Sequence, residues 1–240
     1  MSLATKLGFS DEAAAWLTAL RRELHRDPEL SWKEERTAAR LEAELKTLGA
    51  TDIRRVAGTG VVGRIRGRDK GRTVAIRGDI DALPIEEATG LDFASSNSGV
   101  MHACGHDVHA SWAIGAGLLL SNSPADGDVL LVLQPAEEVG EGAAAMLETG
   151  ALDEAKMIVG AHVDRRYELG QVVAQEGPVN ASTDNFKIDL IGAGAHAARP
   201  HESADPIVGA AALITALQTL VSRRLDPSCL LYTSPSPRDS

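Results

Sequence analysis

The sequence is poor in cysteine, in aromatic residues and in long apolar runs. Only Cys104 and Cys229 occur among 240 residues, which excludes a disulfide framework and leaves both thiols free, as is usual in a reducing compartment. Phe, Trp and Tyr make up only 3% of the chain. No apolar stretch approaches the roughly 18 residues needed to span a bilayer. The sequence therefore predicts a globular protein without a membrane segment.

Positive charge is also scarce. Lys and Arg number 24 against 34 Asp and Glu, a formal net charge of −10. Because binding phosphates requires a concentrated basic surface, we expect no nucleic-acid partner and favour a small-molecule ligand. The N-terminal segment does not pair a basic region with an apolar stretch and a small-residue cleavage site, so we expect a cytoplasmic protein.

What the chain does contain is an alternation of helical and strand patterns. An apolar helical pattern follows Ser10 and ends at Pro28, and a second runs from a capping box at Ser31 and Glu34 to Gly49. Short runs bounded by Gly and Pro then alternate with Ala-rich helical segments, which predicts an α/β fold. The expected strands are 61–67, 73–84, 127–135 and 155–163, and the expected helices between them are 111–121 and 142–150. The last two strands are nearly all apolar, as in central strands covered on both faces.

The pattern changes after Gly170. Residues 185–197 predict a strand with alternating faces, and residues 205–225 predict a long amphipathic helix, so a second α+β unit is expected to open near residue 180. The Pro- and Ser-rich end predicts a disordered tail. The expected division is a catalytic unit at 1–180, a second unit at 181–227 and a tail at 228–240.

The stretch "MHACGHDVHA", residues 101–110, holds three of the seven histidines. If it is extended, His102, Cys104 and His106 point to one side, because side chains alternate along an extended chain. Asp107 is expected to cap the helix that follows. Three interpretations are open at this point: a metal site, a nucleophilic cysteine paired with histidine, and a buried thiol among surface histidines.

Other polar residues follow three of the expected strands. Asp79 and Asp81, Glu137 and Glu138, and His162 all come at strand ends, where open α/β sheets keep their active sites. Alone, each has a plain alternative: a turn, an acidic helix N-terminus or a core histidine. Together with the thiol they offer the mixed N, O and S ligands of a metal site. Aspartates there either bind metal or accept the second N–H of a ligand histidine.

Six blocks of sequence, in this order, carry a family resemblance: "LHRDPELSWKE", "RGDIDALPI", "MHACGHDVHA", "LQPAEE", "GAHV" and "GAGAHAARPHESADPIV". They resemble the metal-dependent amidohydrolases that include hippurate hydrolase, indole-acetyl-amino-acid hydrolases and other N-acyl-amino-acid hydrolases, relatives of aminoacylase and glutamate carboxypeptidase. The match covers roughly residues 16–227. The resemblance implies a zinc-peptidase-like α/β catalytic domain with a central mixed sheet flanked by helices, and an incomplete α+β lid and dimerisation domain.

The resemblance also implies a site for two divalent metal ions. The implied ligands are Cys104, His106, Glu138 and His162. Glu137 is implied as the catalytic base, and Asp81 as the family's aspartate beside the metals. His196 is implied as a lid residue that stabilises the transition state, commonly across a dimer. His102 and His109 are left with supporting or structural roles.

The implied reaction is hydrolysis of the amide bond of an N-acyl or N-aroyl amino acid by a metal-activated water, with a homodimer formed through the lid. Arg199 is the expected partner of the substrate carboxylate, from its charge and placement. The thiolate suits zinc, whereas imidazole and carboxylate ligands also admit manganese, cobalt or nickel.

The end of the sequence departs from the family pattern. Family members are usually longer and return from the lid to the catalytic domain to supply a last ligand histidine. We expect this chain to end inside the lid, because the residues from about Ser228, Cys229 included, no longer resemble the family. An inactive, truncated metal-binding relative is therefore the alternative to an enzyme, and a cysteine hydrolase using Cys104 is the less favoured one.

Overall fold

The computed structural model describes residues 3–6, 8–174, 176–177 and 187–218. The chain divides into two compact units, Met1–Gly170 and Gln171–Ser240, and each is described here by itself. The boundary expected near residue 180 and the tail expected at 228–240 lie outside the described residues. The strand ends that carry the predicted metal ligands all belong to the first unit.

A five-stranded mixed sheet forms the centre of the first unit, in the order β1-β2-β4-β3-β5. The strands are β1 (Thr51–Val56), β2 (Gly60–Ile65), β3 (Val74–Asp79), β4 (Val129–Gln134) and β5 (Ile158–Gly160). Strands β1 and β4 pair antiparallel with β2, whereas β3 pairs in parallel with β4 and β5. The carboxyl ends of β3, β4 and β5 therefore meet at one edge of the sheet. The predicted mixed sheet is confirmed.

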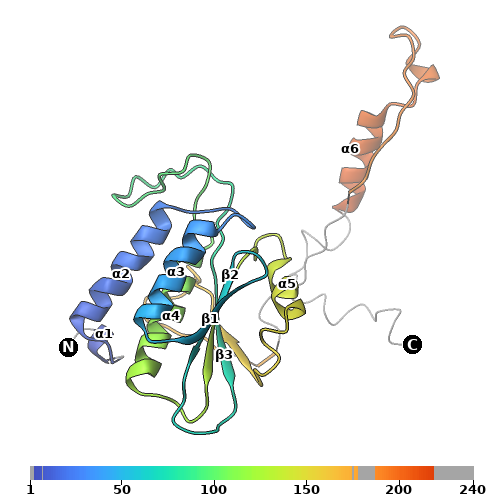
Figure 1. The fold of residues 1–240 in the computed structure, drawn as a ribbon. Helices are drawn as coiled ribbons and strands as arrows, with labels where there is room; N and C mark the ends of the chain where they lie inside the picture. Colours follow the sequence, from blue (N-terminus) through green and yellow to red (C-terminus); the bar gives the residue numbers. More distant parts are fainter. Residues whose placement is uncertain (1–2, 7, 175, 178–186, 219–240) are drawn as a thin grey trace. The chain divides into compact units, whose positions relative to one another are not determined.

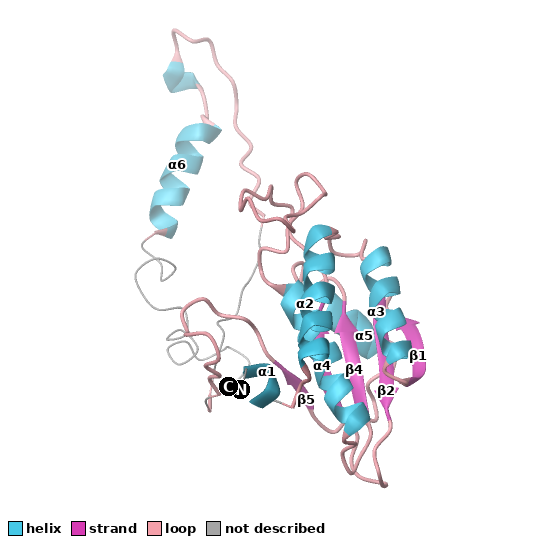
Figure 2. Ribbon diagram, turned by 90° about the vertical axis from the view of Figure 1, so that its left-hand side faces the viewer, coloured by secondary structure: helices cyan, strands magenta, loops and turns pink. Residues whose placement is uncertain are grey.

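Helices cover both faces of this sheet. One face carries α2 (Asp11–Arg26), α3 (Glu35–Thr47) and α4 (His106–Asn122), which lie side by side over the strands, and α5 (Gly142–Glu148) lies on the other face (Figures 1 and 2). A short helix α1 (Leu3–Lys6) precedes them. None of the described helices has the length and apolar content that crossing a membrane requires.

Strand β4 shows how the core is shared between the two faces. Its six residues are all buried, and because successive side chains alternate, Leu131 and Leu133 pack with the three helices while Leu130 and Val132 pack on the side of Met146 in α5. Burying each such side chain contributes about 1.5–3 kcal/mol. The prediction of a strand covered on both faces is correct for β4 and wrong for β5, which is exposed and lies at the edge of the sheet.

Of three predicted helix caps, one is confirmed and two are wrong. Ser10 caps α2 and accepts a hydrogen bond from the Ala13 N–H at 3.1 Å. The capping box at Ser31 does not form, because the Ser31 hydroxyl donates to Asp81 at 2.7 Å and Glu34 is fully buried among other partners. Asp107 is not a cap either. Helix α4 begins at His106, two residues before the start that a cap at Asp107 would give, and it follows a left-handed Gly105.

The described part of the second unit is less regular than predicted. Residues 187–197 form no strand, only the isolated bridge between Ala193 and Ala204, because no neighbouring strand in the described part of the chain pairs with them. Helix α6 (Pro206–Leu217) is capped by the Asp205 side chain and follows the short 3₁₀ helix Pro200–Glu202. The remainder of the helix predicted to residue 225 lies outside the described residues from 219 on.

Candidate metal centre

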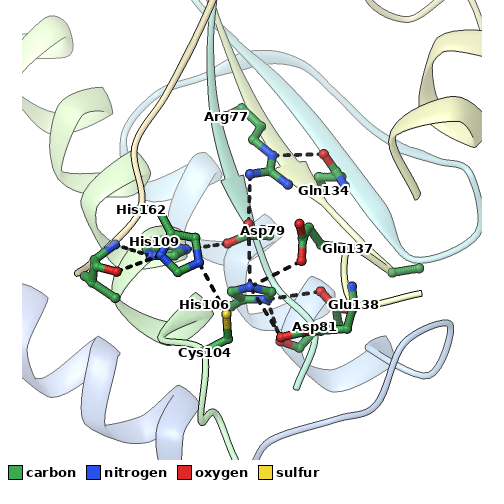
Figure 3. Close-up of polar contacts among 12 residues, drawn as sticks. Arg77, Asp79, Asp81, Cys104, His106, His109, Gln134, Glu137, Glu138 and His162 are labelled. Carbon is green, nitrogen blue, oxygen red and sulfur yellow. Dashed lines mark hydrogen bonds and ion pairs between the residues drawn. The ribbon is translucent and has the colours of Figure 1, made fainter. Parts of the chain in front are cut away.

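The residues predicted at three strand ends and in the stretch 101–110 converge at one edge of the sheet (Figure 3). Donor atoms of Cys104, His106 and His162 lie within 4.8 Å of one another, and so do those of His106, Glu137 and Glu138. His106 belongs to both groups. Segments that follow β3, β4 and β5 therefore meet at the N-terminus of α4, as the parallel pairing of these strands requires.

The imidazole of His106 is fixed in one tautomer. It is fully buried, and its Nδ1–H donates to the backbone oxygen of Asp81 at 2.9 Å, with the Asp81 carboxylate Oδ1 at 3.2 Å. In the neutral ring, Nε2 therefore carries the lone pair. This atom lies 3.7 Å from a carboxylate oxygen of Glu137 and 3.7 Å from one of Glu138, and it has no hydrogen-bond partner among the described residues.

A cation fits this arrangement. The lone pair of His106 Nε2 and the carboxylate oxygens are all acceptors, and facing acceptors without a donor between them are unfavourable when buried. Glu138 Oε1 is likewise buried and lacks a hydrogen-bond partner in the described part of the chain. Burial, together with the neighbouring carboxylates of Glu137 and Asp81, raises the pKa of Glu138. Imidazole, carboxylate and thiol are the donor types that bind zinc and similar ions.

Asp81 joins several residues of the centre through hydrogen bonds. It is buried, and its carboxylate accepts the Ser31 O–H at 2.7 Å and the backbone N–H of Glu138 at 3.0 Å in addition to its contact with His106. Burial by itself would raise the pKa of Asp81, but these hydrogen bonds outweigh it and hold the pKa below its ordinary value. Asp81 thus accepts the N–H of a candidate ligand histidine, as predicted for an aspartate at this strand end.

Cys104 and His162 form the other side of the centre. The His162 Nδ1–H donates to the Val163 carbonyl at 2.7 Å, which leaves Nε2 as an acceptor 3.3 Å from the Cys104 sulfur. Burial and the nearby carboxylates of Glu138 and Glu137 raise the pKa of the Cys104 thiol to about 12. Such a thiol is a poor nucleophile at neutral pH, whereas a bound cation would deprotonate it. The surroundings of Cys104 favour a ligand over a nucleophile.

Asp79 and His109 lie beside the centre and are hydrogen-bonded to each other. His109 Nδ1–H donates to Asp79 at 2.6 Å, and His109 Nε2 accepts the backbone N–H of Val163 at 2.9 Å. The donor atoms of Asp79, His106 and His109 also lie within 4.8 Å of one another. Because both ring nitrogens of His109 already have partners, this third group is better described as a hydrogen-bond network than as a metal site.

Comparison with known proteins identifies the family of the chain. Residues 75–234 match the model of the peptidase family M20/M25/M40. The chain belongs to this family. The resemblance seen in the sequence is thereby confirmed.

Two relatives and one solved structure illustrate the match of this M20-family chain. It is 46% identical over 213 residues to the N-acetyl-L-cysteine deacetylase of Bacillus subtilis, covering 88% of this chain and 51% of the relative. It is 41% identical to the N-acyl-L-amino acid amidohydrolase of Geobacillus stearothermophilus, covering 90% and 60%. A dinuclear metal-binding M20 peptidase from Bacillus subtilis superposes with a TM-score of 0.68 at 41% identity, over 70% of this chain and 48% of that one. The chain thus spans about half the length of these relatives.

Two predicted residues of this M20-family chain lie in its second unit. His196 is exposed, and its Nδ1 accepts the Ala198 N–H at 3.2 Å. Arg199 is exposed and lies 3.5 Å from the Glu202 carboxylate. Since the two units are described separately, the roles expected for His196 and Arg199 remain predictions.

Sequence signals are weaker for the residues that support the centre. Glu34 accepts the backbone N–H of Ala136 at 2.8 Å and the Thr59 hydroxyl at 2.6 Å, and so holds the residue before Glu137. Ala136 itself has a positive φ of 49°, which is uncommon for a residue other than glycine. In the sequence, Glu34 is one carboxylate of the "PELSWKE" block, and its spacing from Ser31 predicts only a local helix cap.

Proposed function

We propose that this M20-family chain carries the metal centre of an amidohydrolase that cleaves N-acyl or N-aroyl amino acids. The observation that carries the proposal is the buried, unpartnered Nε2 of His106, which faces the carboxylates of Glu137 and Glu138 and lies in one cluster with Cys104 and His162. The names of two relatives, an N-acetyl-L-cysteine deacetylase and an N-acyl-L-amino acid amidohydrolase, support the substrate class.

Two divalent ions are the proposed cofactor. The proposed ligands are Cys104, His106, Glu138 and His162. The dinuclear metal binding stated for the Bacillus subtilis structure supports two ions rather than one. When bound, such ions supply Lewis acidity that activates water and polarises a carbonyl. The thiol favours zinc, and manganese, cobalt and nickel also suit this donor set.

Glu137 is the proposed general base. Its side chain is 39% exposed, twice the 19% of Glu138, and the backbone N–H of Glu138 is tied to Asp81. The two adjacent carboxylates can therefore divide the work, with Glu138 held as a ligand and Glu137 free to accept a proton from the attacking water. Glu137 then passes this proton to the leaving amine.

Residues of the second unit complete the proposal. His196 would stabilise the oxyanion, Arg199 would pair with the substrate carboxylate, and the second unit would form a homodimer. These roles, like the cytoplasmic location, rest on the sequence.

The test is hydrolysis of N-acetyl and N-benzoyl amino acids by protein supplied with each of the four metals. We expect chelator to abolish turnover and added metal to restore it. A Glu137→Gln variant should keep its metal and lose turnover by about 10²–10⁴-fold, the usual contribution of a general base. The matched control is Glu141→Gln, a carboxylate that accepts the Trp32 indole N–H at 2.7 Å and should keep turnover.

Each alternative gives a different result in this assay. Normal turnover by Glu137→Gln would rule out the general-base role. Full metal loading without hydrolysis of any acyl amino acid would favour the non-catalytic metal-binding relative. Activity that survives chelator but is lost to a thiol alkylator would favour the cysteine hydrolase.

A further inference from the structure

His162 is the most exposed of the four proposed ligands, so its position depends on contacts with neighbouring residues. It follows β5, a strand of three exposed residues at the edge of the sheet. His109 of α4 packs against its ring. The two rings pack edge to face with centroids 4.4 Å apart, and His109 Nε2 accepts the N–H of the next residue, Val163, at 2.9 Å.

His109 is itself held rigidly (Figure 3). It is buried, and its Nδ1–H donates to Asp79 Oδ1 at 2.6 Å at the end of β3. The other Asp79 oxygen lies 2.8 Å from Arg77, whose Nε donates to Gln134 at 2.9 Å at the end of β4. A continuous series of polar contacts therefore runs from the two central parallel strands through His109 to the segment that carries His162.

Gly105 makes a second contact with the segment that carries His162, through packing rather than a hydrogen bond. A Cβ atom at this position would lie 2.5 Å from Val163 Cγ2, so the Val163 side chain occupies space that only glycine leaves open. The φ of Gly105 is +91°, which L side chains rarely adopt. The amide of Val163 is thus bound by His109 while its side chain packs on Gly105.

We propose that His109 is a positioning residue, which fixes His162 for metal binding through the Val163 amide without binding metal itself. The hydrogen bonds set its tautomer: because Val163 donates to Nε2, the proton of His109 is on Nδ1 and points to Asp79. The proposal rests on the proposed function, in that His162 is taken as a metal ligand. It does not depend on which amide is hydrolysed.

Two substitutions separate the two hydrogen bonds of His109. In His109→Asn, the amide corresponds to Nδ1, so the bond to Asp79 is kept and the acceptor for Val163 is lost. In His109→Gln, the amide oxygen reaches the position of Nε2 and can accept the Val163 N–H. We expect His109→Asn and His109→Leu to weaken cobalt(II) or zinc binding by about 10–100-fold, the usual cost of removing a residue that orients a metal ligand. His109→Gln should recover most of this loss.

The matched control is His25→Asn, which removes another buried histidine. His25 donates its ring N–H groups to the carboxylates of Asp107 at 2.8 Å and Glu87 at 3.3 Å, and its ring packs near Phe93 and His102. These partners lie outside the segment that carries His162. We expect His25→Asn to lower the unfolding temperature and to leave metal affinity unchanged. An equal loss of metal affinity in His25→Asn and His109→Leu would show a general effect of destabilisation and would overturn the proposal.

A second measurement needs neither metal nor a variant. Long-range ¹H–¹⁵N spectra of the metal-free protein should show His109 as the Nδ1–H tautomer, and the Val163 amide should exchange slowly with solvent. An Nε2–H tautomer would overturn the proposal, because Nε2 could then not accept from Val163. Wild-type metal affinity in His109→Leu would overturn it too and leave the proposed function intact. Failure of the wild-type protein to bind metal would instead overturn the proposed function, and this inference with it.

Discussion

The two histidines proposed as ligands lie in very different surroundings. His106 is fully buried at the start of the 17-residue helix α4, and its N–H is held by Asp81. His162 is exposed, follows a three-residue strand, and donates its N–H to the carbonyl of its own neighbour, Val163. Both rings nevertheless present Nε2 to the same cluster. The same tautomer is thus set in His106 by the backbone oxygen and carboxylate of the buried Asp81, and in His162 by the carbonyl of the next residue.

The two sides of the centre also differ in the contacts that support them. The side of His106 is built into the core, whereas the side of His162 depends on contacts made by Gly105 and His109. Both of these residues belong to the "CGHDVH" segment that also contains Cys104 and His106. One short segment therefore supplies two candidate ligands and the residues that contact the segment of a third.

The largest expected effect concerns Cys104, which joins the two sides. Because burial and the carboxylates of Glu138 and Glu137 raise its pKa to about 12 from 9.0, the thiolate fraction at neutral pH falls about a thousandfold. In a Cys229→Ser background with chelator present, iodoacetamide should modify Cys104 about a thousandfold more slowly than a small free thiol. The rate should rise with pH up to about pH 12. A midpoint near pH 8.5 would contradict the raised pKa and would favour Cys104 as a nucleophile.

An intermediate effect is expected from breaking the buried side. Asp81→Ala removes the carboxylate beside His106. The Ser31 hydroxyl and the Glu138 N–H then lose their acceptor. Each buried donor left unpaired costs about 1–3 kcal/mol of unfolding free energy. Metal affinity should fall about 100-fold, at the upper end for a residue that orients ligands. Chemical denaturation and isothermal titration with zinc measure the two quantities.

The control for Asp81 is Asp128, which directly precedes β4 and so lies at the end of this strand away from Glu137 and Glu138. Asp128 accepts the Gly67 N–H at 2.9 Å and pairs with Arg64 at 3.0 Å. Asp128→Ala should lower the unfolding free energy and leave zinc affinity unchanged. Equal zinc affinities in Asp81→Ala and the wild type would mean that Asp81 does not orient a ligand.

The smallest effect is expected on the exposed side. Gly105→Ala places a Cβ 2.5 Å from Val163 Cγ2 and should displace the segment that carries His162, so we expect zinc affinity to fall about tenfold. Gly49→Ala has a similar φ of +74° but meets no atom within 4 Å. It costs only the backbone strain of about 1–3 kcal/mol. If both alanine variants bind zinc equally, the contact between Gly105 and Val163 has no part in the metal centre.

The sequence predicted those parts of the fold and site that depend on local pattern. The continuous apolar run of β4 identified a strand covered on both faces, and polar residues after the parallel strands identified the edge where the candidate ligands meet. Strand β1 was missed because "TDIRRV" is largely polar and exposed. Ser31 and Glu34 were assigned to a local cap, whereas their partners Asp81 and Ala136 lie 50 and 102 residues away in the sequence. Only the fold reveals such contacts.

Titration of the metal-free protein with cobalt(II), followed by absorption, is the decisive test of the proposed metal centre. We expect two bound ions per chain and a near-ultraviolet thiolate-to-cobalt band, because Cys104 is a proposed ligand of a two-ion site. The band should disappear in Cys104→Ser and persist in Cys229→Ser. Absence of the band in the wild-type protein, or a band that survives in Cys104→Ser, would contradict a metal centre built on Cys104, His106, Glu138 and His162.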